Sequence, residues 1–366
     1  MGKIIAAGHI CLDITPKFPE SGAGLKEIFT PGKLTNVEAA DVHTGGSVAN
    51  TGLALKLLGN DVRLIGKVGT DAFGGMVNGI LSGYGVEPLT ADAESVTSYS
   101  VVVAVPGSDR IFLHCPGANN TFTGADVSEE ALSEAVLFHF GYPPIMRRMF
   151  ENDGEELVRL FVRVKEKGIA TSLDMAAVDP SSAAGAADWR RILQRVLPLV
   201  DFFVPSYEEL CFMLDRERYD RLSSAGGDMT VSLTPEEIRP LLDETLAMGC
   251  GSVLIKCGTR GMMYRTACAE RLRTVGSRLP LDSAGWADRE GYQPCFTPDT
   301  VKSATGAGDT AIAAFLTAVL LGRAPEECAR LAAAEGACCV TEYDALSGLK
   351  TIPALEEKIA SGWRTR

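Results

Sequence analysis

The regular alternation of strand and helix patterns between residues 136 and 256 constrains the fold of this chain more than any other feature. Short apolar runs typical of strands occur at residues 136–140, 170–174, 201–204 and 252–256. Helical patterns lie between these runs, at residues 155–167, 189–199, 207–214 and 235–248. This alternation predicts an α/β fold with a central, mostly parallel sheet and helices on both faces. A length of 366 residues fits one large domain spanning residues 1–366.

A smaller β element is predicted beside this sheet. Residues 15–43 are polar and rich in Gly and Pro, and they read as irregular or short β structure outside the main core. Residues 97–114 contain two β-branched runs separated by Pro106-Gly107, which predicts a hairpin. If these two segments pair, a β lid formed by about residues 15–43 and 97–120 would cover the mouth of the core.

Other segments are assigned from their local patterns. Residues 3–7 and 10–14 together read as a first strand, which contains Asp13 near its end. Residues 215–233 and 277–292 resemble surface insertions between the core elements.

The charge and cysteine content exclude several functional classes. The formal net charge is -12, which argues against a nucleic-acid or anionic-membrane surface. The ten cysteines are scattered without a CxxC pair, and the four histidines show no metal-ligand spacing. The longest apolar run, residues 311–321, is too short to cross a bilayer, and the N-terminus lacks the pattern of a signal peptide. We therefore expect a cytoplasmic protein with reduced thiols.

A Gly-Ala-Gly-Asp turn at residues 306–309 precedes an apolar helical run. Glycines let the backbone approach a ligand closely, and a helix N-terminus presents unpaired amides and a partial positive charge. A phosphate would fit there, and Asp309 would stand ready to accept a proton from an attacking hydroxyl. An aspartate at this place also commonly caps its helix. The turn alone leaves both roles of Asp309 open.

A second glycine turn, Gly45-Gly46, opens a helix that Gly59-Asn60 ends. Asn50 lies about one turn into this helix, within reach either of a ligand at the glycines or of a neighbouring loop. The strand pattern of residues 62–68 follows, which is the start of a βαβ unit.

Two common phosphate-binding motifs do not fit. Gly66-Lys67 lacks the following Ser or Thr and the preceding glycine of a P-loop. Gly306-x-Gly308-x-x-Ala311 matches the relaxed dinucleotide fingerprint, but the next acids begin a helix instead of ending a strand. A dinucleotide oxidoreductase remains a third, weaker hypothesis.

Taken together and in this order, three motifs resemble the ribokinase-like PfkB family of carbohydrate and nucleoside kinases. They are the Gly45-Gly46 turn with Asn50, the run LGNDVRLIGKVGTDAFG, and the Gly-Ala-Gly-Asp turn before a C-terminal helix. The resemblance covers nearly the whole chain. It implies the three-layer αβα fold of that family, with a small β lid.

The resemblance also implies roles for individual residues. Asp309 would be the general base that deprotonates the acceptor hydroxyl. The amides that stabilise the transferring phosphoryl group would be those of Gly306, Ala307 and Gly308. The residues that hold the acceptor would be Asp13, Gly45, Gly46 and Asn50, with Arg110 contributed by the lid. Further loop residues that could set acceptor specificity are Asn119 and Tyr142.

ATP and Mg²⁺ are the cofactors that the resemblance implies. The residues around ATP would be Lys256, Gly258, Gly261, Thr305 and Ser206. Glu209 matches the acid that orders Mg²⁺ through water. Ser206 replaces the family's Asn, and Ser303 replaces an Asp that helps to bind a monovalent cation, so potassium activation is left open.

We therefore expect an ATP-dependent kinase that phosphorylates a hydroxyl of a sugar or related small polyol. A nucleoside kinase of the same family, and a relative that binds a sugar or nucleotide without catalysis, are the alternatives. Edges of the lid would pair between two subunits, so a homodimer is also expected.

Overall fold

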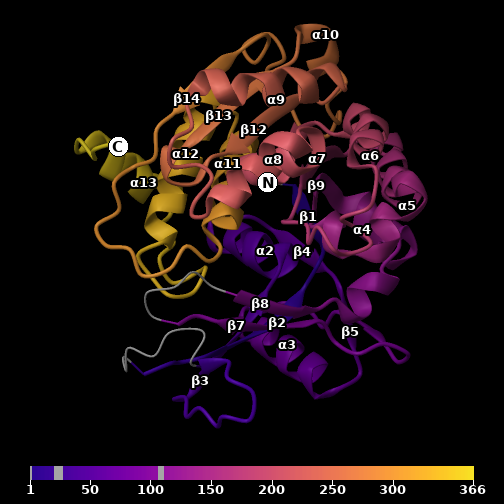
Figure 1. The fold of residues 1–366 in the computed structure, drawn as a ribbon. Coiled ribbons are helices and arrows are strands. Elements are labelled where there is room, and N and C mark those ends of the chain that lie inside the picture. The colour runs from indigo at the N-terminus through magenta and orange to yellow at the C-terminus, as the bar shows by residue number, and fades with distance from the viewer. Residues whose placement is uncertain (1, 20–27, 106–110) are drawn as a thin grey trace.

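An eight-stranded sheet forms the centre of the computed structural model, which describes residues 2–19, 28–105 and 111–366 (Figure 1). Its strands lie side by side in the order β14 (Glu290–Gln293), β13 (Met262–Thr266), β12 (Ser252–Lys256), β11 (Phe202–Phe203), β10 (Ala170–Asp174), β9 (Ala135–Gly141), β1 (Lys3–Gly8) and β4 (Val62–Ile65). Neighbouring strands are parallel except for β13, which is antiparallel to both β12 and β14. The predicted mostly parallel sheet is confirmed.

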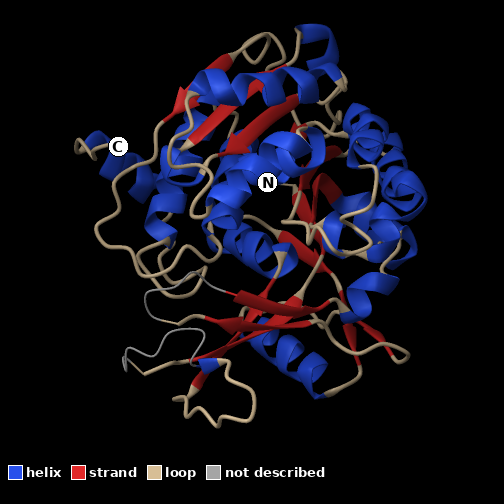
Figure 2. Ribbon diagram, viewed as in Figure 1, coloured by secondary structure: helices blue, strands red, loops and turns tan. Residues whose placement is uncertain are grey.

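Helices cover both faces of this sheet, as predicted (Figure 2). One face carries α4 (Glu129–Glu134), α5 (Arg147–Glu166), α6 (Trp189–Val196), α7 (Tyr207–Leu214) and α9 (Pro235–Ala247). The other carries α2 (Ser47–Leu57), α11 (Ala307–Leu320), α12 (Pro325–Cys339) and α13 (Ile352–Ala360). Successive strand residues point to opposite faces. Ile5 accordingly packs in the first core, whereas Ile4 packs in the second.

A four-stranded sheet lies beside the main one, in the order β3 (Ala40–Gly45), β2 (Cys11–Pro16), β7 (Tyr99–Val103) and β8 (Ile111–Cys115). Residues 10–14 therefore do not continue the first strand of the main sheet, and that prediction is wrong. Gly8, with φ of 123°, redirects the chain between the two sheets, and a Cβ there would lie 2.3 Å from the carbonyl oxygen of Gly141. The predicted turn at Pro106-Gly107 lies outside the described residues.

α3 (Ala72–Gly83) and α2 pack on this small sheet and build a third apolar core. The predicted strand at residues 62–68 is divided, because β5 (Lys67–Gly69) leaves the main sheet and pairs with β6 (Thr90–Asp92). The short 3₁₀ helices are η1 (Gly117–Thr121), η2 (Gly124–Asp126), η3 (Pro143–Ile145), η4 (Leu197–Leu199) and η5 (Gly258–Arg260).

The two predicted insertions differ in their structure. Residues 215–233 contain α8 (Arg216–Ala225), a helix without buried residues. Residues 277–292 follow α10 (Ala269–Leu272) and are not merely a surface insertion. Their last residues form the edge strand β14, and Trp286 packs in the core, where its indole nitrogen donates to the carbonyl oxygen of Arg323. The sequence pattern missed this strand because only four residues form it.

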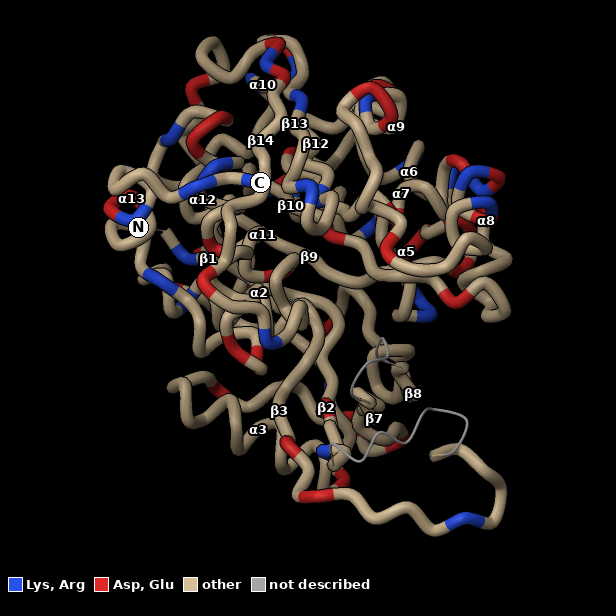
Figure 3. The backbone as a smooth tube through the Cα atoms, turned by 60° about the vertical axis from the view of Figure 1, so that its left-hand side comes forward, with Lys and Arg blue, Asp and Glu red and all other residues tan. Residues whose placement is uncertain are grey.

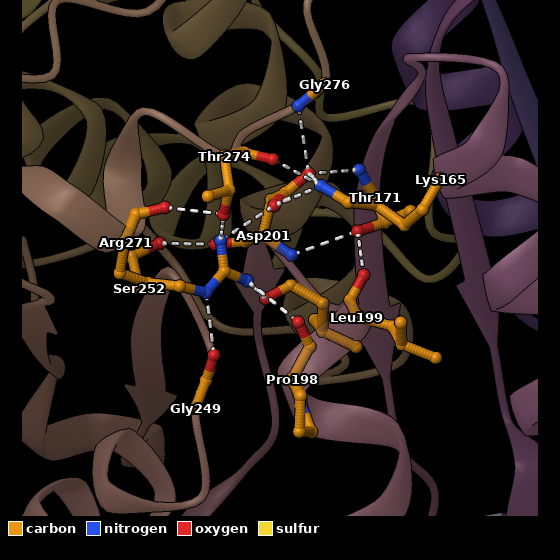
Figure 4. Close-up of polar contacts among 11 residues, drawn as sticks. Lys165, Thr171, Pro198, Leu199, Asp201, Gly249, Ser252, Arg271, Thr274 and Gly276 are labelled. Carbon is orange, nitrogen blue, oxygen red and sulfur yellow. Dashed lines mark hydrogen bonds and ion pairs between the residues drawn. The ribbon is translucent and has the colours of Figure 1, made fainter.

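A buried ion cluster stabilises the amino ends of the parallel strands (Figure 4). Asp201, just before β11, is fully buried and lies 2.8 Å from Nζ of Lys165 and 3.2 Å from Nη1 of Arg271. The amide of Thr171 donates to the same carboxylate at 3.0 Å. These partners satisfy a charge that would otherwise be costly to bury. The cluster is structural, since it lies at the opposite ends of the strands from the site described below.

Acidic and basic residues are interspersed along the chain, as the colours of the backbone in Figure 3 show. This distribution agrees with the sequence, in which the net charge is -12 and the basic residues do not gather in one segment. Within the described ranges, no helix has the length and apolar character needed to span a membrane. All ten cysteines lie in these ranges and all are free thiols.

Candidate active site

The turn at residues 306–309 begins α11 and forms one side of the candidate site. Gly306 has φ of 76°, in the left-handed region that glycine adopts without strain. A Cβ at this position would lie 2.2 Å from the Cβ of Ala345, so close packing also requires glycine here. Residues 306–308 are half-buried, whereas Asp309 is 5% exposed. The first-turn amides of α11 therefore lie at the edge of the site, and the carboxylate lies below them.

Asp309 accepts hydrogen bonds from three side chains outside its own helix. Asn50 donates to Oδ2 at 3.1 Å, whereas Thr51 and Tyr142 donate to Oδ1 at 3.0 and 2.7 Å. Asn50 and Thr51 come from α2, which packs along α11. The carboxylate is thus directed away from the helix amides that a cap would bind. This arrangement favours a chemical role for Asp309 over the capping role that the sequence left open.

Lys256 and Asp174 add a buried ion pair beside the turn. Nζ of Lys256 lies 2.8 Å from Oδ1 of Asp174, and a Cβ built on Gly308 would contact the end of the lysine chain at 3.7 Å. Burial favours the neutral amine, but the carboxylates of Asp174, Glu209 and Asp309 outweigh it and raise the pKa of Lys256. Burial also raises the pKa of Asp174, against the opposing effect of the Lys256 ammonium. The carboxylates around Lys256 thus hold its ammonium in the charged form beside the turn.

The predicted acceptor residues come together at the junction of the two sheets. Asp13 lies on β2, and a Cβ on Gly45 of β3 would lie 2.2 Å from its Oδ2 atom. The thiol of Cys11 donates to Oδ1 of Asp13 at 3.2 Å. Burial raises the pKa of Asp13, and the negative charge of Asp309 contributes in the same direction. The two carboxylates therefore lie in one site. An acceptor that is bound by one carboxylate and deprotonated by the other would require this arrangement.

His9 is a buried polar side chain beside these residues that the sequence analysis did not select. It is 2% exposed, and neither ring nitrogen has a hydrogen-bond partner among the described residues. Its ring lies 5.2 Å from that of His114 and 5.9 Å from that of Tyr142, and Gly46 leaves room for it. Burial and the nearby His114 lower the pKa of His9 well below its usual value, so the imidazole is neutral. A neutral imidazole can both donate and accept a hydrogen bond.

Ser206 and Glu209 form a reciprocal capping box at the start of α7. The amide of Ser206 donates to Oε2 of Glu209 at 2.6 Å, and the amide of Glu209 donates to Oγ of Ser206 at 3.2 Å. These two hydrogen bonds give both residues a structural role, as the cap of the N-terminus of α7. In the described part of the chain, no group of three His, Cys, Asp or Glu residues could hold a metal ion directly. Mg²⁺ that keeps several of its waters needs direct contact with only one or two carboxylates.

The glycines of the predicted nucleotide loop contact protein atoms. Gly261 has φ of 95°, and a Cβ there would lie 2.1 Å from the carbonyl oxygen of Gln293. A Cβ on Gly258 would lie 2.7 Å from Oγ1 of Thr230. The loop follows β12, the strand that ends with Lys256, and is therefore close to the candidate site. Thr305 lies in the turn before α11, and its amide donates to Oγ of Ser303 at 3.1 Å.

The outcomes differ for Asn119 and Arg110, two residues nominated from sequence for specificity. Both amide atoms of Asn119 are used by the backbone of Ile10, with contacts of 3.2 and 2.9 Å. Asn119 therefore fixes the link between β1 and β2, and its nomination for specificity is corrected. Arg110 lies outside the described residues.

Sequence reasoning also missed Thr51 and Asp174. Thr51 directly follows the selected Asn50. Asp174 ends a predicted strand, at the edge of a parallel sheet where ligands commonly bind, and that signal could have identified it.

The chain is similar in sequence to known proteins. The model of the pfkB family carbohydrate kinases matches residues 1–352. The chain is 31% identical to fructokinase-2 of Solanum lycopersicum over 144 residues, which is 38% of this chain and 40% of that protein. It is 25% identical to probable fructokinase-4 of Arabidopsis thaliana over 359 residues, covering 95% of this chain and 94% of that protein.

The fold is also similar to that of a putative ribokinase II from E. coli, solved in complex with ATP and Mg²⁺. The TM-score is 0.70 at 20% sequence identity, and the match covers 99% of this chain and 100% of the other. At this identity the likeness concerns the fold alone.

Proposed function

Because this chain belongs to the pfkB family of carbohydrate kinases, we propose that it transfers the γ-phosphoryl group of ATP to a hydroxyl of a sugar or related small polyol. Members of this family are phosphotransferases with an alcohol group as acceptor, and so is this protein. The observation that carries the finer proposal is the placement of Asp309. It lies in the first turn of α11, and its negative charge contributes to the raised pKa of Asp13 on β2.

In this proposal Asp309 is the general base for the acceptor hydroxyl. A base works only within hydrogen-bond reach of the proton it removes, and three donors hold this carboxylate in one orientation. The amides of residues 306–308 and the ammonium of Lys256 stabilise the charge that develops on the phosphoryl group. The buried Lys256 supplies this charge without reorganisation, because its ion pair with Asp174 already fixes it.

The phosphates of ATP would be held by the turn before α11 and by Lys256, with Gly258, Gly261, Thr305 and Ser206 around the rest of the nucleotide. The space beside Gly308 fits a phosphate group in this assignment. A Cβ built on Gly308 would make only ordinary van der Waals contacts with the side chain of Lys256. Glu209 would contact the water shell of Mg²⁺, which neutralises phosphate charge when bound. Ser303 has a hydroxyl at the position where the family has an Asp carboxylate that helps to bind a monovalent cation. We therefore propose that turnover does not require potassium.

The acceptor would be held by Asp13 with Gly45 and Gly46, while Asn50 orients the base. A carboxylate that can accept two hydrogen bonds suits neighbouring hydroxyls of a polyol. We add His9 to the acceptor site. Burial of its two ring nitrogens without hydrogen-bond partners is costly unless a ligand supplies a partner. The two fructokinases above favour a sugar over a nucleoside.

We further propose that the small sheet closes over the acceptor and excludes water from the phosphoryl group. Its outer strand β8 exposes Ile111, Phe112 and Leu113, an apolar edge that a second subunit would cover in a homodimer. A cytoplasmic location, where ATP and reducing conditions coexist, belongs to the same proposal.

A panel of sugars, polyols and nucleosides tests the function, with ADP release and phosphorylated product measured in the presence of ATP and Mg²⁺. We expect transfer to at least one sugar or polyol and its loss in Asp309→Asn, by about 10³-fold or more. Transfer to nucleosides alone would show that the acceptor is a nucleoside and not a sugar or polyol. Nucleotide or sugar binding without any transfer would indicate a non-catalytic relative.

A further inference from the structure

The two oxygens of the Asp309 carboxylate are not equivalent. Oδ1 accepts hydrogen bonds from the hydroxyl groups of Thr51 and Tyr142, at 3.0 and 2.7 Å. Oδ2 accepts one hydrogen bond from the described residues, from the amide nitrogen of Asn50 at 3.1 Å. Each carboxylate oxygen offers about two lone-pair sites. Oδ1 is therefore fully used by the protein, whereas Oδ2 retains one position for a further donor.

The backbone holds Tyr142 in an uncommon conformation to make this contact. Tyr142 follows β9 and has φ of 73° and ψ of 51°, the left-handed region that costs an ordinary side chain about 1 kcal/mol or more. The preceding Gly141 packs so tightly that a Cβ would lie 2.0 Å from Oγ of Ser47. The amide of Ile145 donates to the carbonyl oxygen of Tyr142 at 3.1 Å. A strained residue fixed from both sides is typical of functional sites.

The phenol remains a donor throughout the physiological range. Burial and the negative charge of Asp309 raise the pKa of Tyr142 well above its usual value. On its other side, the ring lies 5.9 Å from that of His9, so the aromatic body is packed as well as the hydroxyl. The contact with Asp309 thus has a fixed donor and a fixed acceptor.

We propose that Tyr142 is a positioning residue for the base: with Thr51 it occupies Oδ1 of Asp309, so that Oδ2 accepts the proton of the acceptor hydroxyl. This inference rests on the proposed kinase function. The acceptor oxygen keeps the electron pair of its O–H bond and uses it to form the new bond to the γ-phosphorus. The bond from that phosphorus to its bridging oxygen breaks, and its electron pair leaves with ADP. The proton ends on Oδ2, while Oδ1 keeps both donors.

Loss of the phenol hydroxyl should leave one position on Oδ1 empty and the orientation of the carboxylate less fixed. In Tyr142→Phe, we therefore expect kcat to fall about 10-fold with little change in the KM values for ATP and for the acceptor, because the base is held less well only for the transfer step. Thr51→Val removes the other donor to the same oxygen and should lower kcat in the same way, again with KM values close to those of the wild type.

Tyr264→Phe is the matched control, because Tyr264 is equally aromatic but packs in the second core, on β13. Its kcat and KM values should match those of the wild type. A general loss of stability in Tyr142→Phe would lower the folded fraction, which circular dichroism measures, but would not lower kcat per folded molecule. An unchanged kcat per folded molecule in Tyr142→Phe, in an enzyme whose activity depends on Asp309, would overturn the positioning role and leave the proposed function standing.

A readout without turnover separates this inference from the proposed function. In protein labelled with ¹³C at Asp carboxyls, the Asp309 resonance is identified by its loss in Asp309→Asn. At one fixed pH its chemical shift should differ between Tyr142→Phe and the wild type, because the hydrogen bond to Oδ1 is lost. An identical chemical shift would overturn the inference, even if the acceptor panel showed no transfer and the function itself had failed.

Discussion

Nζ of Lys256 lies 2.8 Å from Oδ1 of Asp174, and both side chains are nearly excluded from solvent beside the turn that begins α11. Lys165 and Asp201 form a second buried pair, also at 2.8 Å, at the amino ends of the strands (Figure 4). The two pairs have the same chemistry but different places in the fold. They allow the catalytic and structural consequences of a buried ion pair to be separated.

Lys256→Met should lower kcat by about 10²-fold, because the phosphoryl group loses one stabilising charge. It should also lower the free energy of unfolding by about 3 kcal/mol, since Asp174 is left buried without its partner. Steady-state kinetics and urea unfolding measure the two effects. In the double variant Lys256→Met/Asp174→Leu, stability should recover while kcat stays low. Lys165→Met serves as the control, with a smaller loss of stability, because Asp201 keeps Arg271, and a wild-type kcat at temperatures where it is folded. Equal kcat losses in both single variants would contradict a role for Lys256 in transfer.

Gly45→Ala should weaken acceptor binding, because a Cβ would lie 2.2 Å from Oδ2 of Asp13 and displace that carboxylate. We expect the KM for the best acceptor of the panel to rise about 10-fold, the loss of one charged hydrogen bond, with the KM for ATP unchanged. Gly75→Ala, in α3 with nothing within 4 Å of the added Cβ, should leave both KM values unchanged. A wild-type acceptor KM in Gly45→Ala would exclude Asp13 from acceptor binding.

Glu335 should make the protein less stable as the pH rises. Burial raises the pKa of Glu335 from 4.5 to about 8 in the folded chain. A raised pKa means that the folded state binds the proton more tightly, so the stability is fully present below about pH 4.5 and is lost as the pH rises through about 8. Glu335→Gln should match the wild type near pH 4.5 and exceed its free energy of unfolding by on the order of 5 kcal/mol at pH 8.5. Glu357→Gln on the surface is the control, and equal pH profiles for Glu335→Gln and the wild type would refute the assignment.

His139 should make the protein less stable as the pH falls. It is fully buried between Ser47 and Ser172, with ring contacts of 3.2 and 3.0 Å. Burial, with a smaller effect of Lys256, lowers its pKa from 6.5 to about 3. Its stabilising contribution is present above pH 6.5 and is lost as the pH falls, by about 1.4 kcal/mol per pH unit. His139→Asn should flatten the fall in unfolding free energy between pH 6.5 and 5, whatever its overall stability. The exposed His43→Asn should keep the wild-type slope, and a steep fall in both variants would rule out His139 as the cause.

The local patterns of the sequence determined the main architecture. Strand and helix periods depend on which faces are buried, so the alternation from residue 136 to 256 predicted the parallel sheet and its two helical layers. The Gly-Ala-Gly-Asp turn likewise located the start of α11, because glycine's conformational freedom is a local property. Patterns of this kind failed where a strand was short, as at β14, or where the chain changed sheets, as after Gly8.

Only the tertiary structure decided how Asp309 is held. Its partner Thr51 is 258 positions away along the chain, and Tyr142 is 167 positions away. Such contacts depend on the packing of α2 against α11 and on the direction of the backbone after β9, and no local periodicity encodes either. The same holds for Lys256 and Asp174, which two separate strands bring together. The sequence by itself therefore identified Asp309 as a candidate base and located the turn beside it, and the fold determined that Oδ1 accepts two hydrogen bonds and Oδ2 one from the described residues.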